Sequence, residues 1–273
     1  MTVAQVKNTF SKTGDIDSSI PPSSLELKIS VSMQAIRYVV HSLTHGQVIF
    51  FGEYILHHVE DGQELIRRIE KIYENDEVLQ LNFARVVVGL GGPYLLSPPG
   101  IDIEMNPLQG ATLKQLCHNN NVELVYSLDF ALSFKLRELF TASRFSHLCS
   151  PLFQQVDMMK MPDALYVNIS SAYFDVLRID NNGQVRLLNR YEFKASSDFI
   201  YFLLLCAQEL QAAPEKVTLV LSGEIEERSE IYDLCYRYFR NPQFAQTPPG
   251  ITFSKAFENF PQHRYYNLIN LQA

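Results

Sequence analysis

Apolar and polar residues alternate in two similar segments of the chain, residues 25–56 and 163–193. Alternation with a period of two is typical of a strand that buries one of its faces. In the first strand of the first segment, the inward-facing positions are Leu25, Leu27, Ile29 and Val31. Two further apolar runs follow in each segment, separated by short polar turns. Both segments are therefore predicted to form a three-stranded antiparallel meander.

The two segments correspond position by position. Ser32 matches Ser170, 138 positions later, and Gly46 matches Gly183, 137 positions later, so one residue is lost in the intervening turn. Because the pattern repeats at half the chain length, we expect two similar lobes that face one another. Such folds normally hold a ligand between their halves.

The elements after each meander share one order. In the first half we expect helices over 61–74 and 131–141, strands over 85–89, 94–97 and 123–127, and a loop-rich stretch over 98–121. In the second half we expect helices over 199–211 and 228–239, and strands over 216–222 and 251–254. Three strands, a helix, a strand, a helix and a strand is the order of a ribonuclease-H-like lobe. The predicted fold class is α/β, with two ribonuclease-H-like lobes.

The domain boundaries follow from this order. Residues 1–24 are rich in Ser, Thr, Lys and Asp and end near Pro21 and Pro22, which predicts a flexible leader. The first lobe is predicted over 25–160 and the second over 161–273.

Composition narrows the class of protein. At 273 residues and 47% apolar content, the chain is long enough for two cores. The net charge of −7 is spread without long runs of one sign, so nucleic acid is not expected as a partner. The four cysteines have no C-x-x-C spacing and lie in apolar stretches, which is typical of reduced, buried thiols. No apolar run reaches the roughly 18 residues of a membrane span, and we expect a soluble, cytoplasmic protein.

Three short sequences stand where strands end. Ser30-Val31-Ser32-Met33 and Asn168-Ile169-Ser170-Ser171 occupy the turn between the first two strands of each meander. Leu221-Ser222-Gly223-Glu224 ends a buried strand of the second half. With the duplication and the element order, these positions make residues 25–260 resemble the actin, sugar-kinase and heat-shock-chaperone superfamily, near its bacterial pilus-assembly and cell-division members. More closely, the chain resembles an uncharacterised Bacteroidetes family with an actin-like ATPase fold.

The resemblance implies a nucleotide site at these turns. In the superfamily each turn carries an Asp-x-Gly-Thr/Ser motif, whose Gly lets backbone N–H groups approach phosphate and whose Asp positions Mg²⁺. Here Ser30 and Asn168 replace the two acidic residues, and Ser32 and Ser170 replace the two glycines. Without these carboxylates the attacking water loses its organiser, so hydrolysis is disfavoured. No catalytic and no metal-binding residue is expected.

The adenosine-side motif of the superfamily is a strand that ends in Ser/Thr-Gly-Gly. Only Gly223 remains here, because Glu224 replaces the second glycine with a charged side chain. A glycine after an apolar strand commonly just ends the strand, which is the favoured interpretation. The degenerate nucleotide-binding positions are thus Ser30, Ser32, Asn168, Ser170, Ser171, Ser222, Gly223 and Glu224.

Two hypotheses about function stay open. The first is a non-catalytic actin-like module, or pseudo-ATPase, that serves as a scaffold and binds a protein partner without a cofactor. The second is a nucleotide-binding switch or weak ATPase that binds ATP with Mg²⁺ and rebuilds the metal site from Asp175 or Glu224. The loss of both Asp residues favours the first.

The aromatic end of the chain could serve either hypothesis. Its large side chains are Phe257, Phe260, Tyr265 and Tyr266. They either seal the sheet of the second lobe or form an exposed docking patch, and the pattern alone leaves both interpretations open.

Overall fold

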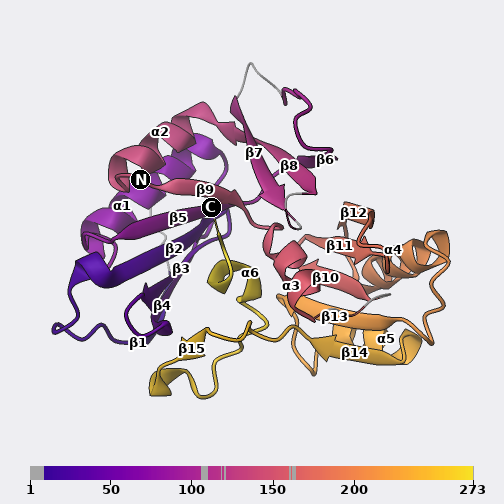
Figure 1. Ribbon diagram of the computed structural model, residues 1–273. Coiled ribbons are helices and arrows are strands. Elements are labelled where there is room, and N and C mark those ends of the chain that lie inside the picture. The colour runs from indigo at the N-terminus through magenta and orange to yellow at the C-terminus, as the bar shows by residue number, and fades with distance from the viewer. Residues whose placement is uncertain are drawn as a thin grey trace, which may run out of the picture. The chain divides into compact units, whose positions relative to one another are not determined.

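The computed structural model describes residues 9–105, 110–117, 119, 121–159, 161 and 164–272. The chain divides into two compact units (Figure 1). Unit 1 comprises Met1–Leu148, Pro249–Phe260 and Leu271–Ala273, and unit 2 comprises Cys149–Pro248 and Pro261–Asn270. The main boundary therefore lies at Leu148, earlier than the expected position after residue 160. The end of the chain is shared between the units instead of belonging to the second one.

Unit 1 is built on a seven-stranded sheet with the order β1-β4-β3-β2-β5-β9, and β15 also pairs with β4. The strands are β1 Thr9–Gly14, β2 Leu25–Val31, β3 Ala35–Ser42, β4 Gln47–Ile55, β5 Arg85–Leu90, β9 Arg144–His147 and β15 Thr252–Phe253. β2, β3 and β4 form the antiparallel meander, and β5 and β9 continue the sheet in parallel. The short helices η1 Pro22–Ser24 and η2 Lys255–Phe257 precede β2 and follow β15.

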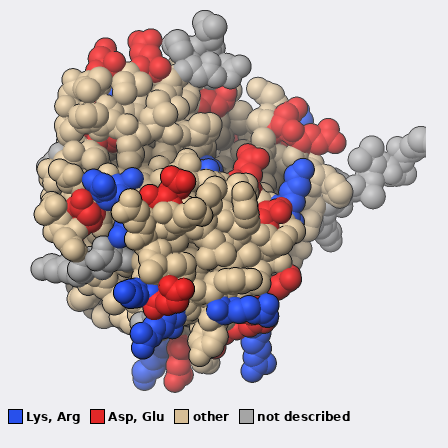
Figure 2. Space-filling view, turned by 90° about the vertical axis from the view of Figure 1, so that its right-hand side faces the viewer, with Lys and Arg blue, Asp and Glu red and all other residues tan. Residues whose placement is uncertain are grey.

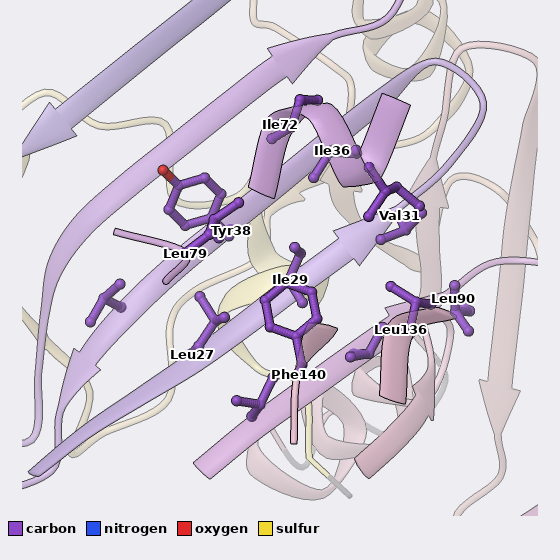
Figure 3. Close-up of a cluster of buried hydrophobic side chains, with 14 of the residues drawn as sticks. Leu27, Ile29, Val31, Ile36, Tyr38, Ile72, Leu79, Leu90, Leu136 and Phe140 are labelled. Carbon is purple, nitrogen blue, oxygen red and sulfur yellow. The ribbon is translucent and has the colours of Figure 1, made fainter. Parts of the chain in front are cut away.

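The core of unit 1 lies between this sheet and two helices, α1 Gly62–Asn75 and α2 Phe130–Leu139. Alternate residues of β2 and β3 point to the helices, where Ile72, Leu136 and Phe140 meet them (Figure 3). A smaller sheet, with the order β6-β8-β7, is inserted between β5 and α2. Its strands are β6 Tyr94–Ser97, β7 Gly110–Cys117 and β8 Val122–Asp129.

Unit 2 has a five-stranded sheet with the order β12-β11-β10-β13-β14. The strands are β10 Leu165–Ile169, β11 Tyr173–Ile179, β12 Val185–Glu192, β13 Thr218–Gly223 and β14 Asn241–Phe244. The helices are α3 Pro151–Met159, α4 Ser196–Glu209, α5 Glu230–Tyr238 and α6 Tyr266–Ile269. α4 supplies Phe199, Ile200 and Leu203 to the core, where they pack on the strands together with Cys235 of α5. α3 contacts β10 and β11, and α6 contacts β13.

The two units repeat one design, as the sequence predicted. β2-β3-β4-α1-β5-α2-β9 corresponds to β10-β11-β12-α4-β13-α5-β14 in order and in strand pairing. Even the turn bond recurs, because the Ser32 N–H donates to the Ala35 carbonyl at 3.0 Å and the Ser170 N–H donates to the Tyr173 carbonyl at 2.8 Å. The predicted fold class, with its matched meanders, is confirmed.

Two expectations from the sequence are wrong, because pairing with distant parts of the chain creates strands where none was predicted. Residues 9–14 of the expected leader form β1, which pairs antiparallel with β4. Within the expected loop-rich stretch, residues 110–117 form β7, which pairs with β8. Neither strand has strong apolar alternation: β1 is mostly exposed and β7 is mostly half-buried, and each gains its order from its pairing partner.

The second face of the unit 1 sheet is covered by the end of the chain. Phe260 packs edge-on against Phe51 with ring centroids 5.0 Å apart, and Phe257 is 2% exposed. A Cβ atom on Gly89 would lie 2.5 Å from Leu271, so this glycine leaves room for that side chain. The aromatic end is thus divided: Phe257 and Phe260 belong to unit 1, while Tyr265 and Tyr266 are buried in unit 2. Of the two interpretations that the sequence leaves open, the exposed docking patch is therefore excluded for Phe257, Tyr265 and Tyr266, which are buried.

Buried polar groups lie on two strands of that sheet. Glu26 and Lys28 of β2 and His41 of β3 are each less than a tenth exposed, and the Lys28 Nζ lies 3.8 Å from a Glu26 carboxylate oxygen. His41 Nε2 has no hydrogen-bond partner among the described residues. Burial, with the nearby Lys28 charge as the second cause, lowers the pKa of His41 to about 3.

On the helix side, Asp76 joins α1 to the meander. Its carboxylate accepts hydrogen bonds from the Tyr38 hydroxyl and, at 2.8 Å, from the Tyr54 hydroxyl. It also accepts the backbone N–H of Val78 at 3.0 Å. Burial and these bonds raise the pKa of both tyrosines, which therefore remain neutral donors.

We expect Asp76→Ala to lower the free energy of unfolding by about 2–4 kcal/mol, because two tyrosine hydroxyls lose their acceptor. Urea denaturation measures the change. Asp102→Ala is the control, since this side chain is 96% exposed and should change stability by less than about 0.5 kcal/mol. Equal losses in the two variants would contradict a role for the Asp76 cluster.

His41 should make the fold sensitive to acid. The unfolded state takes up a proton near the ordinary pKa of 6.5, whereas the folded state does so only at about 3. Between these values the unfolded state binds one more proton than the folded state. The free energy of unfolding therefore decreases by about 1.4 kcal/mol for each unit by which the pH is lowered. We expect His41→Leu to remove this slope in denaturation curves recorded from pH 7 to pH 4. The exposed His57→Leu should keep it, and an unchanged slope in His41→Leu would refute the assignment.

Candidate functional site

The turn between β2 and β3 is closed by Ser32. Its Oγ accepts the backbone N–H groups of Ala35 at 3.0 Å and Gln34 at 3.3 Å. Its own N–H and hydroxyl both donate to the Ala35 carbonyl. Three backbone donors of the turn, at positions 32, 34 and 35, therefore already have acceptors within the turn itself.

The turn between β10 and β11 has a similar conformation and the same pattern of exposure. The Ser170 N–H bonds to the Tyr173 carbonyl, and Ser171 is exposed. The Ala172 carbonyl accepts the N–H of Phe193 at 3.0 Å, which ties the turn to the end of β12.

Strand pairing places equivalent residues in one row across each sheet. In unit 1 the row is Gly89, Ser30, Arg37 and Glu53. In unit 2 the row is Ser222, Asn168, Asp175 and Arg190. The row brings together Asn168 and Ser222, whose Oγ lies 3.3 Å from the Asn168 Oδ1. In unit 1 the Ser30 hydroxyl donates only a long bond of 3.4 Å to the Arg37 carbonyl.

Each row ends in an ion pair. The cation lies on the second meander strand in unit 1 and on the third meander strand in unit 2. In unit 1, Arg37 Nε donates to Glu53 Oε1 at 2.6 Å. In unit 2, Arg190 binds Asp175 through both carboxylate oxygens, with Nε to Oδ1 at 2.8 Å and Nη2 to Oδ2 at 3.0 Å. The Asp175 side chain is 2% exposed, and the Arg190 guanidinium carbon lies 3.9 Å from the centroid of the Tyr173 ring. Asp175 is thus part of a bidentate pair.

Gly223 sits where two segments of backbone approach closely. Its φ is +87°, and a Cβ atom there would lie 2.0 Å from the Ile169 carbonyl oxygen. Three successive N–H groups then bond to carbonyls of the chain: Gly223 to His263 at 2.9 Å, Glu224 to Ile169 at 2.7 Å and Ile225 to Gly223 at 2.8 Å. This glycine ends the strand, which was the favoured interpretation from sequence.

His263 holds this segment from the other side. Its Nε2 lies 2.9 Å from the Ile225 carbonyl, and its ring stacks on Phe244 with centroids 3.9 Å apart. Nearby, the Thr247 hydroxyl donates to Gln262 at 2.7 Å. The role of His263 could not be seen in the sequence, because its hydrogen-bond partners Gly223 and Ile225 lie about forty residues away and no motif links them.

The ion pairs were also missed, although a signal existed. Arg37 and Asp175 are 138 positions apart, and Glu53 and Arg190 are 137 apart, which are the offsets of the duplication itself. A comparison of charged residues at these offsets shows that both members of the first ion pair have a charged counterpart of opposite sign in the second.

Other chemical features of the described residues bear on function. Within the described ranges, no group of three or more His, Cys, Asp or Glu side chains could hold a metal ion. On the face seen in Figure 2, basic and acidic side chains are interspersed. All four cysteines are buried. Every described helix is too short or too polar to traverse a bilayer.

Gly223→Ala should be strongly destabilising, because the new Cβ would clash with the backbone of β10. We expect a loss of about 3 kcal/mol or more in chemical denaturation. Gly100→Ala is the matched control, since Gly100 has a φ of +84° but a Cβ atom there would meet no other atom within 4 Å. It should lose only about 1 kcal/mol, which is the conformational cost alone. Similar losses in the two variants would argue against the close approach.

Comparison with sequence families matches one part of the chain. Residues 109–241 match the profile of a family described as "Protein of unknown function (DUF3822)". This match spans just under half of the chain. No curated protein sequence matches.

Comparison with solved structures covers nearly the whole chain. A Bacteroides thetaiotaomicron protein with an actin-like ATPase fold and unknown function is similar with a TM-score of 0.72 at 15% identity, over 95% of this chain and 100% of that one. The PilM–PilN type IV pilus biogenesis complex contains a chain that is similar with a TM-score of 0.54 at 11% identity, over 89% and 96% of the two chains. With its two matching units, the chain has an actin-like ATPase fold.

Proposed function

We propose that this protein is a non-catalytic actin-like module that acts through binding a protein partner. The observation that carries the proposal is the pair of rows through Ser30 and Asn168, the two positions where the superfamily has metal-positioning carboxylates. Each row holds one cation and one anion, so each has a formal charge of zero. A divalent ion needs anionic oxygen ligands that are free to bind it, and neither row supplies one of its own.

The occupied backbone donors support the same conclusion. Phosphate binding at a turn needs N–H groups that point at the anion. In unit 1 the Ser32 hydroxyl accepts two of them, and after β13 three in succession bond to carbonyls. Phosphate would have to break these bonds to bind.

The two carboxylates that could replace the lost acidic residues, Asp175 and Glu224, do not favour a Mg²⁺ site. Both oxygens of Asp175 bind Arg190, so recruiting this residue for Mg²⁺ would leave a partly buried guanidinium without its counterion. Glu224 stands where the superfamily has a glycine, and its charge opposes a polyanion nearby. We therefore expect no bound cofactor.

A protein partner is the remaining role for the retained architecture. PilM, which shares the fold, was solved in complex with PilN. The buried thiols suit a reducing compartment, and we expect the protein to reside in the cytoplasm.

Nucleotide binding is tested by a thermal-shift series with ATP, ADP and GTP in the presence of Mg²⁺. A ligand at about 100 times its dissociation constant would stabilise the fold by about 2.7 kcal/mol and, at roughly 2–4 °C for each kcal/mol, raise Tm by roughly 5–11 °C. We expect no shift, and no ATP hydrolysis above background. Ser30→Asp combined with Asn168→Asp should not restore hydrolysis while Glu224 remains.

The opposite outcome is equally specific. A dose-dependent rise of Tm with one nucleotide, lost in Asn168→Ala, would refute the scaffold proposal and support a nucleotide switch.

A further inference from the structure

The outer edge of β4 is covered by two other segments of the chain. β1 pairs antiparallel with Phe50–Ile55, and β15 pairs in parallel with Gln47 and Val48. Together these two segments pair with every residue of this third meander strand except Ile49. An exposed strand edge is a template for pairing, and here it is satisfied internally.

The equivalent strand of unit 2 lacks such a cover among the described residues. β12 lies at the margin of its sheet and pairs with β11 on one side (Figure 1). Arg186, Asn189 and Glu192 are exposed along it. Since the two units otherwise repeat one design, β12 is the position at which a strand is missing.

We propose that the strand that completes this edge is β12 of a second copy of the chain, paired antiparallel about a two-fold axis at Asn189. The proposal does not depend on the proposed function. In this register Leu187 of each copy faces Tyr191 of the other, and Arg186, which lies at a bulge of β12, comes opposite Glu192. Opposite charges and apolar pairs at facing positions stabilise antiparallel strands.

Charge selects this register over its neighbours. Shifting the axis to Leu188 places Arg186 opposite Arg190, and shifting it to Arg190 places two arginines face to face. Like charges directly opposite one another destabilise strand pairs. Charged residues on an edge strand ordinarily discourage pairing. In an antiparallel pair of two β12 strands, however, the positive residue of each strand comes opposite the negative residue of the other.

The surroundings of β12 offer apolar surface to a second copy. A hollow of about 710 Å³ lies at the Glu192 end of the strand, lined partly by Tyr173, Phe193, Tyr201 and Phe202. The Tyr201 side chain is 62% exposed, and Phe202 stacks on Tyr191 of β12 with ring centroids 5.5 Å apart. Leu187 of the second copy, facing Tyr191, would add to this apolar surface.

A charge-reversal series tests the pairing by sedimentation of the full chain across a concentration range. We expect the wild-type protein to dimerise, and Arg186→Glu or Glu192→Arg alone to weaken the dimer about tenfold or more, because each places like charges at two symmetric points. The double variant should regain wild-type affinity. Arg67→Glu, on an exposed residue of α1, is the matched control and should have no effect.

The register has its own test. Asn189→Cys should form an intermolecular disulfide on mild oxidation, because this residue faces its own copy, whereas Leu188→Cys should not. The four native cysteines are buried and give a low background. A wild-type protein that stays monomeric, or a dimer indifferent to both charge changes, would overturn the proposal. So would equal crosslinking of the two cysteine variants.

Discussion

The parallel pairing of the first meander strand with the strand after the helix is the constraint on which both units depend. In unit 2 it sets Asn168 beside Ser222 and Ile169 beside Gly223. The strands then diverge so little that residue 223 has no room for a Cβ atom. The same closeness turns the Glu224 N–H toward the Ile169 carbonyl. Thus the geometry that ends the strand also decides which donors remain for a ligand.

The duplication has kept this geometry while exchanging the charges placed on it. Arg37 and Asp175 occupy equivalent positions, as do Glu53 and Arg190, so the direction of each ion pair is reversed. At a given separation and dielectric, a pair can be reversed without cost to its own attraction, because the Coulomb energy contains the charges only as their product. What changes is the local field beside the turn, where position 30 has a guanidinium in the next strand and position 168 a carboxylate.

Much of this fold could be predicted from local pattern. The meander strands and main helices follow strong periodicity, and Ser32 and Ser170 could be matched because short turns preserve their spacing. β1 and β7 could not be predicted, since their order comes from pairing with β4 and β8 across long separations. The site shows the same division: the altered turn residues were visible in the sequence, whereas the bonds from His263 to the segment after β13 were not. The division of the aromatic end between the units could not be predicted either. Phe260 and Tyr266 are both large aromatic residues, and the sequence pattern does not indicate which unit each one packs in.

The shared end of the chain has a consequence for biosynthesis. The chain passes between the units after Leu148, Pro248, Phe260 and Asn270. Unit 1 therefore cannot cover Phe51 and Gly89 until residues up to Leu271 have left the ribosome, by which time all of unit 2 has been made. Domains of most proteins fold in turn, the amino-terminal one first. Here the nascent first unit stays unfinished on one face throughout synthesis of the second, and no single proteolytic cut could release either unit intact.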